Sequence, residues 1–147
     1  MILDAYSRRG IGWARDRTME DSLTLAALRR ALAHRSVQAG LIHHSDRGSP
    51  DASTDYTDLL KTNGIAISLS RQGPPWDNAA CQSCMKTLQY EEVLRHEYRD
   101  RPDARASIRE FLEKVYHPKR RHSARGYLPP AKFQAIPKDA AARQLSV

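Results

Sequence analysis

The sequence predicts an α/β fold in which helices pack on a mixed sheet. Short apolar runs typical of strands alternate along the first half of the chain with segments whose apolar residues recur at helical spacing. The predicted order is strand, strand, helix, strand, helix, strand, and such alternation is typical of a layered α/β domain. A chain of 147 residues that is 40% hydrophobic is expected to form one domain with a moderate core.

The first elements are a hairpin and a helix. Residues 1–5 and 11–14 predict two short strands joined by a polar turn. Residues 19–35 predict an amphipathic helix, capped by Asp21 or Ser22, that covers one face of the sheet.

A strand, a helix and another strand follow. Residues 41–44 predict a short buried strand that ends just before Asp46, and Ser53 or Thr54 can cap a helix that continues to residue 63. Gly64 suits the position just after that helix, where a left-handed residue is common. Residues 65–69 predict the next strand.

The second half is predicted to be mainly helical. After a Gly- and Pro-containing loop at 70–75, Asp77 or Asn78 can cap a helix to about residue 96. Asp103 can cap a second helix over 104–116. A basic turn over 117–125, a single helical turn near 126–133 and a loose tail from Pro137 complete the chain.

The charge favours polyanionic partners. Lys and Arg outnumber Asp and Glu by 24 to 17, which gives a net charge of +7, and basic residues crowd toward the C-terminal part. Such clusters are typical of phosphate contacts.

Other functional classes find little support in the sequence. Cys81 and Cys84 form one Cys-x-x-Cys, but a structural zinc site needs four ligands, and both residues fall inside a predicted helix, where packing is the favoured role. The absence of a long apolar run or of a leader segment predicts no membrane span and a cytoplasmic location.

Several motifs occur in the order found in one known family. They are Leu3 to Arg9 with Gly12-Trp13, His43 to Ser49, Trp76 to Ala79, Tyr116 with Lys119 to Ser123, Gly126-Tyr127, and Pro130 to Phe133. The chain therefore resembles the integrase-like transposases of bacterial insertion sequences, whose catalytic core has the ribonuclease-H-like (retroviral-integrase-like) fold. The resemblance covers about residues 1–134 as a partial catalytic core and leaves 135–147 as the tail.

The resemblance implies phosphoryl transfer assisted by two divalent metal ions, Mg²⁺ or Mn²⁺, held by two Asp and one Glu. Asp46 falls on the second Asp, as a catalytic and metal-binding residue. The family places its Glu after thirty-five further residues, and here that position holds Gln82. A neutral amide binds a hard dication far more weakly than a carboxylate does, so Gln82 is expected to be non-functional.

The first catalytic Asp of the family lies on a strand upstream of the segment that begins this chain. Asp4 matches a different acid, and we expect it to help the hairpin turn. That upstream strand lies centrally in the family's sheet, so its loss would leave strand edges unpaired. An upstream reading frame that encodes the strand would indicate that the true start lies before Met1.

Five basic residues are candidates for DNA phosphate contacts: Arg71, Lys86, Lys119, Arg120 and Arg121. His43 and His44 are expected to pack or to form hydrogen bonds rather than to bind metal, and Trp13 and Trp76 to be core or loop anchors. DNA, in the form of transposon ends and target, is the implied partner, together with another copy of the chain or an intact transposase.

The sequence thus predicts a transposase core fragment that is inactive by itself. Two alternatives remain open at this point. The chain could be a non-catalytic remnant that binds nucleic acid or a transposase, or it could be a fragment that does not fold alone.

Overall fold

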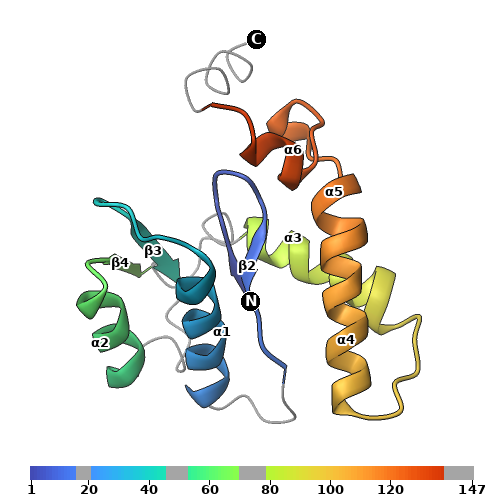
Figure 1. Cartoon of the computed structure of the whole chain (residues 1–147), viewed down its shortest axis with the longest axis horizontal. Helices are drawn as coiled ribbons and strands as arrows, with labels where there is room; N and C mark the ends of the chain where they lie inside the picture. The colour runs from blue at the N-terminus through green and yellow to red at the C-terminus, as the bar shows by residue number, and fades with distance from the viewer. Residues whose placement is uncertain (16–20, 46–52, 70–78, 138–147) are drawn as a thin grey trace. The chain divides into compact units, whose positions relative to one another are not determined.

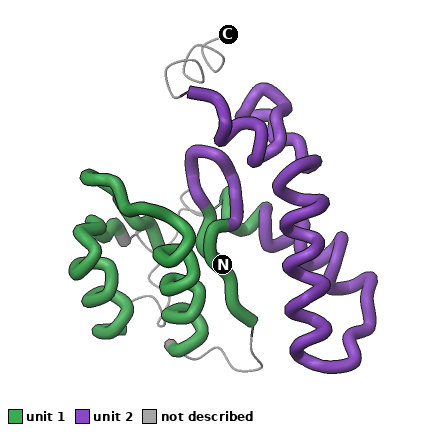
Figure 2. The backbone as a smooth tube through the Cα atoms, in the orientation of Figure 1, with its two compact units in different colours: residues 1–3, 11–83 green, residues 4–10, 84–147 purple. Residues whose placement is uncertain are grey.

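The computed structural model describes residues 1–15, 21–45, 53–69 and 79–137. Within these ranges the helices and strands of the predicted α/β class are present (Figure 1). They group into two compact units, one formed by residues 1–3 and 11–83 and the other by residues 4–10 and 84–147 (Figure 2).

Strands β1 (Ile2–Leu3) and β2 (Gly10–Gly12) pair as predicted, although both are shorter than expected. Asp4 organises the loop between them. Its carboxylate accepts hydrogen bonds from the Tyr6 amide at 3.1 Å and the Ser7 hydroxyl at 2.6 Å. The predicted role of Asp4 in the hairpin turn is thereby confirmed.

The first unit is built around a parallel strand pair. Strand β3 (Ile42–Ser45) runs parallel to β4 (Ala66–Leu69), with Ile42 opposite Ala66 and Ser45 opposite Leu69. The prediction that β3 is buried was wrong, because the Ile42 side chain is 52% exposed. Strands of parallel sheets are normally buried on both faces. Among the described residues, β3 has only β4 as a neighbouring strand.

Helices α1 (Asp21–His34) and α2 (Thr54–Thr62) cover this pair. The first unit's core contains Leu28 from α1, Tyr56 and Leu60 from α2, and Ile65. Gly64, at φ +70°, follows α2 as predicted. Ser53 occupies the N-cap of α2, but its side chain makes no capping hydrogen bond.

The helix predicted from Asp77 or Asn78 to His96 is shorter and interrupted. Its expected caps lie outside the described residues, and the α-helical part, α3, is Ala79–Leu88. Residues Gln89–Val93 then form the wider π-helical turn η2, after which the helix ends. Cys84 is buried as predicted, whereas Cys81 is partly exposed.

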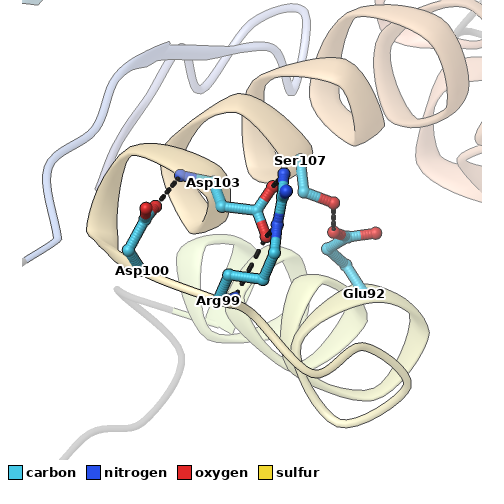
Figure 3. A network of polar contacts seen from close by, with 5 residues as sticks. All are labelled: Glu92, Arg99, Asp100, Asp103 and Ser107. Carbon is cyan, nitrogen blue, oxygen red and sulfur yellow. Dashed lines mark hydrogen bonds and ion pairs between the residues drawn. The ribbon is translucent and has the colours of Figure 1, made fainter.

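Helix α4 (Arg101–Phe111) begins earlier than predicted, because its cap is Asp100 rather than Asp103. The Asp100 carboxylate accepts a hydrogen bond from the Asp103 amide at 2.8 Å, and Pro102 suits the first turn (Figure 3). The Asp103 carboxylate is instead paired with Arg99, at 3.2 Å.

A buried carboxylate ties η2 to α4. Glu92 accepts a hydrogen bond from the Ser107 hydroxyl at 2.5 Å (Figure 3) and another from the Tyr98 hydroxyl at 3.2 Å. A buried carboxylate without partners would be costly, so these bonds fix the pairing of the two helices.

The α4 helix continues without a break through the π-helical turn η3 (Leu112–Tyr116) into α5 (His117–Lys119) (Figure 1). The predicted basic turn at 117–125 is therefore partly helical, and it ends in the 3₁₀ turn η4 (Ser123–Arg125). The expected single helical turn is α6 (Pro130–Gln134), whose Phe133 is fully buried. Most of the predicted loose tail lies outside the described residues.

Candidate nucleic-acid interface

Helix α3 carries two of the predicted site residues. Gln82 and Lys86 lie one turn apart on this helix, and both side chains are exposed. Residues four apart face the same side of a helix, so the two side chains share one face of α3. Lys86 supplies a positive charge beside an amide that carries none.

Two other candidates, Asp46 and Arg71, lie outside the described residues, as does the predicted anchor Trp76. The described part of the candidate site therefore contains Gln82 and Lys86 but neither Asp46 nor Arg71. Within residues 1–15, 21–45, 53–69 and 79–137, no three His, Cys, Asp or Glu side chains gather as metal ligands do.

Of the two histidines of β3, His43 behaves as expected for a packing residue. The His43 ring lies against Tyr56, and its Nε2 atom is 3.0 Å from the Tyr56 hydroxyl oxygen. Burial lowers the pKa of His43, and the neighbouring His44 lowers it further. His44 is exposed.

Trp13 likewise anchors local structure. Its carbonyl accepts a 2.7 Å hydrogen bond from the Arg30 guanidinium, which also lies 5.7 Å from the centre of the indole ring. The Trp13 loop is thereby attached to α1, in agreement with the predicted anchoring role.

The basic segment at the end of α5 holds the remaining candidates. Lys119, Arg120 and Arg121 are all exposed. Arg120 donates to Glu91 at 2.5 Å, whereas Lys119 and Arg121 make no hydrogen bond or ion pair with any residue in the described ranges. Lys119 and Arg120 also border a hollow of about 200 Å³ with Phe111 and Val115.

Two buried aromatic side chains lie under this basic segment. The Tyr116 ring contacts the rings of His117 and His122, with centroids 5.9 Å and 5.7 Å apart. Burial raises the pKa of Tyr116 and lowers the pKa of His117 and of His122, so these groups are uncharged near neutral pH.

Arg125 joins the basic segment to the loop after β1. Its guanidinium donates to the carbonyl of Ala5 at 2.7 Å and to that of Tyr6 at 2.5 Å, and it lies 5.3 Å from the ring centre of Phe133. Neither Arg125 nor the loop residue Arg8 was among the predicted DNA contacts. The sequence signals were that Arg8 belongs to a motif shared with the family and that Arg125 falls in the predicted basic turn over 117–125.

Comparison with known proteins identifies the family of this chain. The integrase core domain family matches residues 1–75, and a second description of the integrase core domain matches residues 63–130. The chain belongs to the integrase core domain family. Its resemblance to insertion-sequence transposases is confirmed by relatives over nine-tenths of its length.

Three relatives illustrate the match. An uncharacterised 31 kDa protein of insertion element IS600 from Shigella sonnei is 38% identical over 90% of this chain and 49% of its own length. The IS904 transposase of Lactococcus lactis is 35% identical over 90% of this chain and 52% of its own. The IS3A transposase InsF of Escherichia coli is 34% identical over 91% of this chain and 46% of its own length. The chain thus spans about half the length of these relatives.

The fold agrees with a solved integrase assembly. The simian T-cell lymphotropic virus intasome, determined in complex with a PP2A regulatory subunit, contains a chain that matches 84% of this one with a TM-score of 0.64. That match covers 43% of the viral chain at 15% identity and supports the integrase fold alone. The predicted ribonuclease-H-like, retroviral-integrase-like class is confirmed. No described helix is long and apolar enough to cross a membrane.

Proposed function

We propose that this integrase core domain binds DNA through phosphate contacts and does not catalyse DNA strand transfer by itself. The observation that carries the proposal is Gln82, which lies exposed on α3 where the family's chemistry needs a carboxylate. The proposed DNA includes transposon ends and target, and the proposed protein partner is a second copy or an intact transposase.

The donor set does not fit a pair of divalent metal ions. Mg²⁺ and Mn²⁺ favour charged oxygen ligands, and the Gln82 amide supplies only a neutral oxygen. Asp46 is the one carboxylate of this chain that the family motif assigns to metal. We therefore propose no catalytic step through metal for this chain.

The basic residues support binding. Lys86, Lys119, Arg120 and Arg121 are exposed, and a net charge of +7 attracts a polyanion at low salt. Arg71 is proposed as a further contact from its place in the sequence. Arginine and lysine side chains that contact phosphates position DNA without reading its bases.

The activity half of the proposal is tested with supercoiled plasmid DNA and Mg²⁺ or Mn²⁺. We expect no nicking by the wild-type chain, because Gln82 supplies a neutral amide where the family uses the carboxylate of its Glu. Metal-dependent nicking that Asp46→Asn abolishes would show instead that the chain is an active nuclease.

The binding half is tested by fluorescence anisotropy on a labelled duplex at several salt concentrations. We expect affinity that falls steeply with salt and that weakens when Lys119, Arg120 and Arg121 are replaced together by Gln. The charge-matched control replaces the exposed Lys61, Arg105 and Arg109 by Gln. Equal losses in both triple variants would argue against a localised interface.

A further inference from the structure

Arg8 adopts a backbone conformation that its residue type disfavours. Its φ angle is +65°, in the left-handed region where a β-carbon is crowded and where glycine or asparagine is preferred. The surrounding loop holds it there, since the Arg8 amide donates to the Asp4 carbonyl and the Asp4 amide to the Arg9 carbonyl, both at 2.8 Å. A strained residue that its surroundings hold in place is a reason to look for a function of its side chain.

The side chain of Arg8 makes no polar contact with the described residues that would account for this strain. It makes no hydrogen bond or ion pair with a residue in the described part of the chain, although it is half-buried. The next residue, Arg9, differs: its guanidinium donates to Gln134 at 3.1 Å and lies 3.6 Å from a carboxylate oxygen of Glu113.

The groups around Arg8 are mostly positive or lack a partner. Burial lowers the pKa of His122, and the positive charges of Arg8, Arg120 and Arg125 lower it further. The His122 Nε2 atom is buried and has no hydrogen-bond partner among the described residues. A guanidinium without an acceptor, in a part of the chain with a surplus of positive charge, is suited to an anion.

The nearby acids are already engaged. The Asp4 carboxylate holds the Tyr6 amide and the Ser7 hydroxyl, Glu91 accepts from Arg120, and Glu113 pairs with Arg9. Arg125 is also occupied, because its guanidinium donates to backbone carbonyls. The unmatched donor that remains is therefore the Arg8 guanidinium.

We propose that Arg8 is a phosphate-binding residue whose guanidinium holds one phosphodiester of the DNA backbone. The planar guanidinium can donate two parallel hydrogen bonds to phosphate oxygens. This inference rests on the proposed function and extends the interface from the 119–121 segment to the loop after β1.

The test compares Arg8→Gln with Arg9→Gln in the full chain, because both variants remove one positive charge from adjacent positions. We expect Arg8→Gln to weaken binding to a labelled duplex by about tenfold, the loss of one charge-assisted contact. The slope of log affinity against log salt is expected to decrease by about 0.9. Arg9→Gln is expected to leave both the affinity and the slope unchanged, and Arg8→Lys to keep most of the slope.

A folding control separates loss of structure from loss of contact. Arg8→Gly removes the guanidinium and relieves the disfavoured φ angle, so its melting temperature should equal or exceed that of the wild type while its DNA affinity falls as for Arg8→Gln. A variant that binds DNA like the wild type would overturn the role of Arg8 and leave the 119–121 interface standing. A wild-type chain that binds no DNA at low salt would overturn both.

The source of the phosphate is tested with inorganic phosphate added at constant ionic strength. We expect DNA to protect the wild-type chain from thermal unfolding more strongly than inorganic phosphate does, with Arg8→Gln losing part of the DNA effect. If Arg8→Gln loses only the stabilisation by inorganic phosphate and keeps full DNA affinity, the site binds a free anion and the proposal is wrong.

Discussion

His117 is a buried histidine whose environment disfavours its charged form. Its side chain is 3% exposed, and neither ring nitrogen has a hydrogen-bond partner among the described residues. Burial lowers its pKa, Arg9 lowers it further, and Glu113, 3.7 Å from Nδ1, acts in the opposite direction. The neutral ring is therefore part of the folded structure near neutral pH.

This burial predicts a pH-dependent stability. A histidine whose pKa is lower in the folded chain than its ordinary value of 6.5 binds its proton more readily in the unfolded state. Stability is therefore complete above pH 6.5 and falls as the pH falls below it, by at most about 1.4 kcal/mol per pH unit for one group. Urea unfolding of His117→Gln at pH 7.5, 6.5 and 5.5 should show a smaller fall than the wild type.

The exposed His34 is the control for this measurement. His34→Gln should retain the full wild-type fall in unfolding free energy. Identical pH profiles for the wild type and His117→Gln would show that His117 contributes nothing to acid sensitivity.

At the level of single residues, the sequence predicted the local hydrogen bonding of one side chain but not the backbone angle or the lack of polar partners of another. The Asp4 turn was predicted correctly. The assignment of Gln82 to the family's Glu position, from its spacing to Asp46, stays a prediction. Arg8 was missed, because a positive φ angle and an unmatched guanidinium arise from folded geometry and leave no pattern in an arginine-rich motif.

At the level of elements, periodicity located the helices but not their ends. Asp100 and Asp103 are both suitable caps, and their roles are decided by Arg99, which pairs with Asp103. The π-helical turns η2 and η3 insert a residue into the helical repeat. Apolar spacing was interpreted with the regular α-helical repeat of 3.6 residues, so it did not predict these wider turns.

Gly12 provides a test of how β2 packs on α1. A β-carbon at this position would lie 2.2 Å from the Ala27 carbonyl oxygen and 2.8 Å from the Ala31 β-carbon. We expect Gly12→Ala to destabilise the chain by about 1–3 kcal/mol in urea unfolding, since backbone cannot move aside cheaply. A site with room for the methyl group would instead be stabilised slightly, so an unchanged or higher midpoint would contradict this packing.

At the level of the whole molecule, the order of strands and helices and the integrase fold followed from the sequence. The exposure of β3 did not. A short apolar run predicts a buried strand, but burial depends on neighbouring strands, and Leu41 and Ile42 are about half exposed. In the part of the chain that the structure describes, β3 pairs with one strand, and its exposed apolar side chains form a site for association with other chains.

Ile42→Lys should therefore reduce self-association of the chain. A charge at an exposed strand edge opposes pairing with another edge, and the cost to stability should stay within about 0.5 kcal/mol because the side chain is largely exposed. Size-exclusion chromatography at increasing protein concentration measures the effect. Tyr127→Lys, which replaces a 67% exposed residue outside any strand, should behave like the wild type.

The contacts of Arg125 have a consequence for the order of folding. They join residues 119 and 120 positions apart, from the loop after β1 to the 3₁₀ turn η4. Contacts between residues so far apart in the sequence form late, because closing a long loop lowers the chain entropy before the contacts can stabilise the loop. During synthesis the loop after β1 therefore stays without these bonds until the segment around Arg125 has left the ribosome, so Arg8 reaches its final surroundings only after that segment has been made.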